Sequence, residues 1–362
     1  MVVRMDSKVY FVKASVGDGA QVISDKSRRL FKAGGFAGCF KENDFTAVKV
    51  HVGEGRNNTY VKAPYIKGLV DELVALNTKP FLTDTTTLYV GQRNNALNHT
   101  VLAAEHGFSS AELGIPFIVS DGLFGTTEMA IEINGRHNKE VFIATDIVMC
   151  QSILSIAHVT GHIMAGLGAT LKTLGMGCAS KKGKLKQHAA VKLSIGRNCT
   201  LCGECLRHCP VDAIKLGKTK ARIIQSKCIG CAECMAHCRF KAVKCNWGQE
   251  TGVLQENIAE YARGVLLGKQ DKAAFFNFLM SVTEDCDCFG TPDMHTMVGD
   301  IGIVASTDPV AVDQAALDLV ENEAGRKLQK LLKNEGLDPG CQIEHAQSLG
   351  LGSKRYELIE IH

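Results

Sequence analysis

The chain has 362 residues, enough for two or three domains, and its 45% hydrophobic and 22% charged residues form an ordinary globular balance. A formal net charge of +3 is too close to neutral to favour nucleic-acid binding. We find neither an N-terminal secretion signal nor an apolar run of about 18 residues, so we expect a cytoplasmic protein that does not enter a membrane.

The N-terminal half alternates short apolar runs with helical periodicity, which predicts an α/β fold with an open, mostly parallel sheet. The predicted strands are 46–50, 80–82, 116–119 and 153–157. The predicted helices are 19–32, 64–76 and 94–105. The dipeptide Asn134-Gly135 predicts a hairpin between 129–133 and 140–144.

Polar residues follow the predicted strands, at the sheet edge where α/β proteins bind ligands. These residues are His51, Gly53 and Glu54, then Asp84 and Arg93, then Asp121, then His158, Gly161 and His162, and finally Ser306, Thr307 and Asp308. An Asp or Ser after a strand can instead cap a helix, an interpretation favoured for Asp308 and balanced for Asp84. Taken together, the set predicts a rim that binds a small molecule or a metal.

The stretch 161–172 is rich in glycine and ends in Lys172. Its backbone amides could cup an anion that the lysine neutralises, although the stretch is not a Walker A loop. Tight packing of a small-residue helix is the alternative interpretation.

Residues 181–197 carry six basic side chains and no acidic one. They form either a solvated linker or a docking patch for a phosphorylated substrate or an acidic electron donor. We expect such a donor to be a redox protein of the ferredoxin or flavodoxin type.

The next segment holds most of the cysteines, of which the chain has 15. Without export, so many cysteines indicate metal ligands rather than disulfides. Two blocks, 199–209 and 228–238, each space four cysteines by two, two and three residues, which is the bacterial two-cluster ferredoxin pattern. In this pattern the fourth cysteine of each block binds the [4Fe-4S] cluster that the first three cysteines of the other block hold. One [4Fe-4S] cluster is therefore assigned to Cys199, Cys202, Cys205 and Cys238, and the other to Cys228, Cys231, Cys234 and Cys209.

The blocks are an internal repeat with an offset of 29 residues, and Ala213 and Ala242 recur with the cysteines. Pro210 follows the first block, as in ferredoxins, whereas Arg239 follows the second. Structural zinc is the alternative, but zinc sites generally use separated pairs of ligands, which this continuous spacing fits poorly.

After this module the predicted elements are helices over 253–267 and 270–282, a strand over 301–305, a helix over 309–320 and an edge strand over 356–361. We therefore expect 1–194 and 249–362 to form one α/β domain. Residues 195–248 are predicted to be an inserted α+β two-cluster ferredoxin domain.

Three cysteines outside the module form a further candidate site. Cys286 and Cys288 stand one residue apart, and Cys178 lies in another glycine-flanked loop. Two interpretations are balanced: a third metal, cluster or redox-thiol site, and plain packing of small apolar side chains.

Nearly the whole chain resembles the family of uncharacterised iron–sulfur centre proteins with domain of unknown function 362. The resemblance rests on 48–54, 82–84, Gly161-His162, 172–178, Lys184, His188, the Cys-x-Cys at 286–288, and 308–313. It implies an α/β domain with a ferredoxin insert, typical of anaerobes, and it assigns no reaction.

Two functions are consistent with these features. The first is a reductase that passes electrons from two clusters to a substrate or further metal centre at the rim. Its site would comprise His51, Asp84, His162 and Lys172, together with Cys178, Cys286 and Cys288. The second is a non-enzymatic electron carrier or a metallocofactor-assembly factor.

Overall fold

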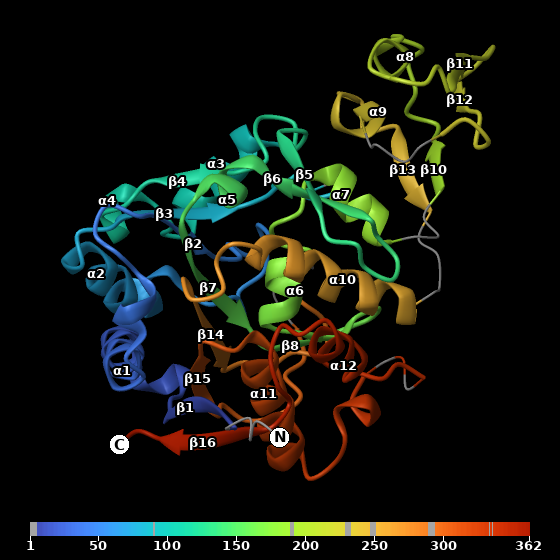
Figure 1. The fold of residues 1–362 in the computed structure, drawn as a ribbon. Coiled ribbons are helices and arrows are strands. Elements are labelled where there is room, and N and C mark those ends of the chain that lie inside the picture. The colour runs from blue at the N-terminus through green and yellow to red at the C-terminus, as the bar shows by residue number, and fades with distance from the viewer. Residues whose placement is uncertain are drawn as a thin grey trace.

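An eight-stranded sheet forms the centre of the protein in the computed structural model (Figure 1). The structure describes residues 6–89, 91–188, 192–228, 233–246, 251–288, 294–332, 334 and 336–362. The strands in spatial order are β16 (Tyr356–Glu360), β1 (Ser7–Lys13), β15 (Gly302–Ser306), β14 (Ala273–Leu279), β7 (Ser152–His158), β2 (Phe45–Lys49), β3 (Lys79–Asp84) and β4 (Phe117–Val119). Only β15 runs antiparallel to its neighbours β1 and β14, so this open sheet is mostly parallel, as predicted.

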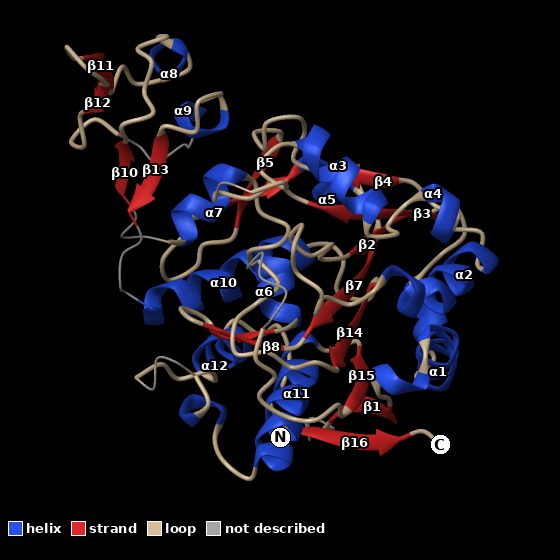
Figure 2. Cartoon of the chain, turned by 180° about the vertical axis from the view of Figure 1, so that it is seen from behind, coloured by secondary structure: helices blue, strands red, loops and turns tan. Residues whose placement is uncertain are grey.

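Helices cover both faces of the sheet (Figure 2). One face carries α1 (Ala20–Ala33), α2 (Lys67–Ala75) and α3 (Ala96–Glu105), and the other carries α6 (Thr170–Gly175), α10 (Thr251–Leu266), α11 (Pro309–Ala324) and α12 (Cys341–Ser348). Successive residues of a strand point to opposite faces, so Phe275 of β14 joins one apolar core and Phe276 joins the other. The central strands therefore bury side chains on both faces of the sheet.

The predicted elements before the module are confirmed, with bounds that shift by a few residues. The predicted hairpin is β5 (Glu128–Glu132) and β6 (Glu140–Ala144), with Asn134 in the left-handed region at φ 47°. After the module, the helices predicted at 253–267 and 309–320 are α10 and α11, and the predicted strand at 356–361 is the edge strand β16.

The helix predicted over 270–282 is wrong, because this segment forms the central strand β14. All seven residues of β14 are buried. A short apolar run that is buried on both faces has no period that separates a strand from a helix. Strand β1 and helix α12 lie outside the elements predicted from the sequence.

The antiparallel direction of β15 removes Ser306, Thr307 and Asp308 from the predicted rim. The carboxyl end of β15 lies at the opposite edge of the sheet from the carboxyl ends of β14 and β7. Asp308 instead caps α11, where its Oδ1 accepts hydrogen bonds from the amides of Val310 (2.8 Å) and Ala311 (2.9 Å).

The glycine-rich stretch forms a hairpin of β8 (Thr160–His162) and β9 (Gly166–Gly168), not a small-residue helix. A Cβ at Gly161 would lie 2.4 Å from the carbonyl oxygen of Glu284, so close backbone packing accounts for this glycine. The anion-binding interpretation stays a prediction.

The basic segment begins as helix α7 (Lys181–Gln187), in which Lys181 and Lys184 are buried. Lys181 donates to the carbonyl of Asn94 (2.6 Å), and Lys184 donates to Thr85 Oγ1 and to the carbonyl of Ala179. Both interpretations, a solvated linker and a docking patch, are therefore wrong for these two lysines. The spacing of charges in the sequence does not reveal that their side chains are buried.

The module projects from the main body at the upper right of Figure 1. Its elements are β10 (Lys192–Ile195), α8 (Glu204–Arg207), β11 (Ile214–Leu216), β12 (Ala221–Ile223), α9 (Glu233–Ala236) and β13 (Val243–Asn246). The chain enters on β10 and leaves on β13, and these strands pair antiparallel. Strands from both sides of this excursion share the central sheet, while the domain boundaries 1–194, 195–248 and 249–362 stay predictions.

The remaining short helices are α4 (Ser110–Leu113), α5 (Thr145–Met149), and the 3-10 turns at Val16–Asp18, Phe36–Cys39, Ala63–Ile66 and Leu328–Lys330. Within the described ranges, none of the helices combines the length and the apolar character needed to cross a membrane.

Candidate functional site

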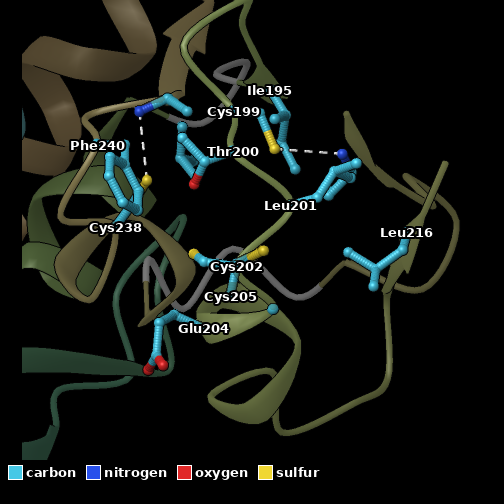
Figure 3. Close-up of a pocket in the computed structure, with 14 residues that line it drawn as sticks. Ile195, Cys199, Thr200, Leu201, Cys202, Glu204, Cys205, Leu216, Cys238 and Phe240 are labelled. Atoms are coloured by element: carbon cyan, nitrogen blue, oxygen red, sulfur yellow. Dashed lines mark hydrogen bonds between the residues drawn. The ribbon is translucent and has the colours of Figure 1, made fainter. Parts of the chain in front are cut away.

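Four cysteines of the module line one hollow (Figure 3). They are Cys199, Cys202, Cys205 and Cys238, the set that the spacing assigns to one cluster. Burial, followed by the nearby thiols of Cys199, Cys238 and Cys202, raises the pKa of Cys205, as expected where several sulfurs converge. The distant fourth member, Cys238, thus lies with the first block.

Backbone amides point at the cysteine sulfurs in a repeated pattern. The amide of Ala213 donates to Cys209 Sγ (3.2 Å), and the amide of Ala242 donates to Cys238 Sγ (3.3 Å). The residue before each alanine has a positive φ, 48° at Asp212 and 52° at Lys241, which turns the next amide back toward the sulfur. Amide donors to thiolates are among the features that set iron–sulfur potentials.

The second predicted set is described only in part, because Cys231 lies outside the described residues. His208 and His237, which precede the fourth cysteine of each block, stack with ring centroids 3.6 Å apart. The two blocks therefore meet at these two histidines.

Across the described ranges, no three His, Cys, Asp or Glu side chains are grouped so as to hold one metal ion. A cubane is not such a site, since each of its four thiolates binds a different iron. The donor set in the hollow, four cysteines with amide donors at their sulfurs, fits a [4Fe-4S] cluster.

The module packs against loops that follow β3 and β4. Leu88 and Leu185 belong to the same apolar cluster as Cys234 of the module. The ring of Phe124, in the loop after β4, lies 4.8 Å from the ring of His237. The module thus contacts the sheet edge at which the parallel strands end.

At that edge the two thiols of Cys286 and Cys288 lie together with Lys172 and His51. His51 follows β2, and its Nε2 is 3.5 Å from Cys288 Sγ. The amide of Gly53 donates to His51 Nδ1 (3.1 Å), which leaves Nε2 as the ring nitrogen that presents an N–H to the sulfur. Lys172 comes from α6, and its ammonium hydrogen-bonds with Cys286.

The residue between the two cysteines anchors them to the sheet. The Asp287 carboxylate is buried and accepts from His158 Nδ1 (2.7 Å), at the end of β7, and from Thr59 Oγ1 (2.8 Å). Burial opposes ionisation, but His158 and then Thr59 hold the pKa of Asp287 below its usual value. The sequence interpretation missed Asp287, although its place between two cysteines was a usable signal.

Asp84, a predicted catalytic residue, ends β3 in a buried ion-pair network. Its Oδ1 is 2.9 Å from Lys49 Nζ, and its Oδ2 is 3.2 Å from Arg93 Nη1. Burial disfavours the charge, but Lys49, His99 and then Arg93 hold the pKa of Asp84 well below its usual range. Arg93 extends this network, because its Nη2 donates to the hydroxyl of Tyr89.

Tyr89 connects this network to the thiols, and the sequence interpretation missed it. Burial raises the pKa of its phenol well above the usual value, and the nearby Cys288 sulfur raises it further. Tyr89 directly follows Leu88, which packs in the apolar cluster of the module. It thus lies between the module and the thiols.

His162 also lies in this region, whereas Cys178 does not. His162 Nδ1 accepts from the amides of Met164 (3.1 Å) and Ala165 (2.9 Å). Burial and the positive charge of Lys172 lower its pKa well below the usual value, so the ring is neutral. Cys178 is fully buried in an apolar core, where burial raises its pKa to about 12. The charged groups nearest to Cys178 are Lys49 and Lys184 rather than those around Cys286 and Cys288.

Comparison with known proteins gives one family match and two weak structural likenesses. The model of a family described as "Domain of unknown function (DUF362)" matches residues 46–318. A search of the curated proteins finds no match to this chain.

The first solved structure is a Thermotoga maritima protein determined by structural genomics, with TM-score 0.40 and 13% identity over 85% of this chain and 58% of that chain. The second is the lactate racemase apoprotein from Thermoanaerobacterium thermosaccharolyticum, with TM-score 0.34 and 11% identity over 66% of this chain and 49% of that chain. This chain therefore spans about half the length of these two proteins.

Proposed function

Because this chain belongs to the DUF362 family, whose function is unknown, its function has to be inferred from its own residues, and we propose an iron–sulfur reductase. In this proposal two [4Fe-4S] clusters bind in the module and supply electrons to an oxidised substrate. The substrate binds at the strand-end site, which we define as His51, Tyr89, His162, Lys172, Cys286 and Cys288.

The observation that supports the proposal most directly is the convergence of Cys238 with the three cysteines of the first block. A zinc site built from neighbouring residues has no need for a fourth cysteine from the other block. A two-cluster ferredoxin pattern requires that exchange.

The side chains around the thiols support a role in reduction rather than electron carriage alone. Lys172 keeps its proton because, although burial opposes its charge, Cys286 and Cys288 raise its pKa above the usual value. His162 is neutral and His51 directs an N–H at Cys288, so the site can hold and deliver protons beside sulfur. A simple electron carrier has no need for such groups.

Electron paramagnetic resonance tests the cluster part of the proposal. Anaerobically prepared protein reduced by dithionite should give spin-coupled signals from two [4Fe-4S]⁺ centres. A diamagnetic protein that contains stoichiometric zinc would contradict it.

Reoxidation kinetics separate a reductase from an electron carrier. Reduced protein, freed of dithionite, is mixed with a disulfide, an N-oxide or a quinone, and the decay of the cluster signals is followed. A reductase should reoxidise faster with one of these acceptors in the wild type than in the Cys286→Ser/Cys288→Ser variant, although both keep their clusters. Equal rates with every acceptor would favour the carrier.

A further inference from the structure

Cys286 and Cys288 differ in their surroundings although they are only two residues apart. Cys288 is half-buried and faces His51 Nε2 at 3.5 Å, whereas Cys286 is buried and faces the ammonium of Lys172. The two sulfurs also hydrogen-bond to each other. One thiol is therefore partly exposed, and the other is buried beside it.

The same contacts give the two sulfurs opposite acidities. The hydrogen bond from Cys286, and then Lys172 and the N–H of His51, hold the pKa of Cys288 well below that of a free thiol, against the effect of burial. That hydrogen bond and burial raise the pKa of Cys286 well above the usual value. The two sulfurs thus differ in acidity in the sense that separates an attacking from a resolving cysteine.

The backbone allows the two sulfurs to bond. Asp287 and Cys288 lie in a turn, so the 286 and 288 Cα atoms are closer than the roughly 6.6 Å that two residues span in an extended strand. Disulfides need Cα atoms about 4.4–6.8 Å apart. His158 and Thr59 fix the intervening Asp287 to the sheet, which keeps this turn in place in both redox states.

Cys341 provides a natural comparison within the same chain. It is also half-buried, but burial and the carboxylates of Glu256, Asp338 and Glu344 raise its pKa to about 11. Arg136 lowers this pKa, but its effect is smaller than that of each of the three carboxylates. Lys172 and the N–H of His51 therefore distinguish Cys288 from an ordinary half-buried thiol.

We propose that Cys286 and Cys288 form a redox-active dithiol in which Cys288 attacks a disulfide substrate and Cys286 resolves the intermediate. The proposal deepens the reductase function, on which it relies only for the source of electrons that restores the dithiol. The substrate class is a disulfide small enough to reach Cys288 between His51 and Lys172.

The reaction balances without a further reactant. The Cys288 thiolate bonds to one substrate sulfur, the substrate S–S bond breaks, and the first thiol leaves with a proton from solvent. Cys286 then loses its proton and attacks Cys288, the mixed disulfide breaks, and the second thiol leaves with that proton. Two electrons and one proton return the resulting disulfide to its thiol and thiolate, and two one-electron clusters in the module match that need.

Differential alkylation tests the dithiol directly in the full-length, cluster-loaded protein. The protein is equilibrated anaerobically in glutathione buffers of graded potential, alkylated, and analysed by peptide mass spectrometry. We expect Cys286 and Cys288 to pass together from doubly alkylated to a linked disulfide in one two-electron transition, while Cys341 stays alkylated throughout. Cys288→Ser should abolish the transition, and Cys341→Ser should leave it unchanged.

Several outcomes would overturn the proposal. One is a pair that stays fully alkylated under oxidising buffers, and another is a pair protected from alkylation by a retained metal. If two cluster signals accompany either result, the dithiol proposal fails and the reductase proposal stands. If the disulfide forms in protein that gives no iron–sulfur signals, the reductase proposal fails and the dithiol proposal stands.

The alkylation rate of Cys288 as a function of pH provides a second measurement. It keeps both cysteines in the protein, so it does not require that a cysteine variant folds. Wild-type Cys288 should react with iodoacetamide at pH 7 at a rate that is already near its plateau. Lys172→Met should move the profile to higher pH and slow the reaction at pH 7 about tenfold, whereas Lys172→Arg should restore most of it. An unchanged profile in Lys172→Met would contradict the assigned role of the lysine.

Discussion

The cysteine-rich module and the strand-end site hold sulfur atoms in physically different ways. In the module, cysteines from two short blocks converge within residues 199–238, and backbone amides donate to the sulfurs. At the strand-end site the groups come from the ends of several strands, and buried ion pairs hold them. The first arrangement depends on local turns, and the second depends on the whole sheet.

This difference has a consequence for the chemistry of the sulfurs. Backbone amides do not titrate, so the hydrogen-bond donors at the sulfurs of the module stay the same as the pH changes. At the strand-end site, by contrast, N–H groups of Lys172 and His51 lie beside the two thiols. In the proposed function, the module therefore carries electrons alone, and the strand-end site couples electrons with protons.

The largest expected effect comes from removing a cluster ligand. Cys238→Ser and Cys205→Ser should each lose the same cluster signal and about four of about eight irons, because their sulfurs line one hollow. Cys209→Ser should lose the other signal. Electron paramagnetic resonance and iron analysis of each variant check this prediction. If the alkylation rate of Cys288 also fell in these variants, the module and the strand-end site would not be independent.

A second, smaller effect is expected in the ion-pair network. Asp84→Asn should lower the free energy of unfolding by about 3–5 kcal/mol, because Lys49 and Arg93 then lose a buried counter-charge. Urea unfolding followed by circular dichroism measures the loss.

The pH dependence of that loss has a definite sign. The pKa of Asp84 lies well below its usual range in the folded state, so its stabilisation is complete above the unfolded value of about 3.9 and fades as the pH falls through the folded value. The gap between wild type and variant should therefore narrow below about pH 4. If the difference in the free energy of unfolding stayed constant below pH 4, the charge of Asp84 would not be the source of the stabilisation.

A third prediction concerns His51 and reports on one hydrogen bond. His51→Asn should slow the alkylation of Cys288 at pH 7 about tenfold, the equivalent of about 1.4 kcal/mol of thiolate stabilisation. His106, whose Nδ1 is 2.7 Å from the carbonyl of Val52 in the neighbouring loop, supplies a control. His106→Asn should leave the alkylation rate unchanged, and equal slowing in both variants would indicate a general disturbance of the loop.

The smallest effect belongs to a residue at the opposite edge. Asp308→Ala should cost about 1 kcal/mol through loss of the cap on α11. Cluster signals and the reactivity of Cys288 should stay at their wild-type values. If either of them changed, the two edges of the sheet would be coupled.

The sequence predicts these two regions unequally, for a physical reason. Local spacing determines which cysteines of the module converge, so the pairing of Cys238 with the first block is visible in the sequence. Ions such as Asp84 and Lys49 meet only after the sheet forms, and a single reversed strand, β15, moves Asp308 to the other edge. Segments that are buried on both sides, such as β14, have no periodicity to read.

Iron and acid-labile sulfide content per chain tests the central claim most directly. Anaerobically purified full-length protein should contain about eight irons and about eight sulfides, as two cubanes require. Stoichiometric zinc without sulfide in such protein would contradict the account, because the module would then hold no electron-transfer centre.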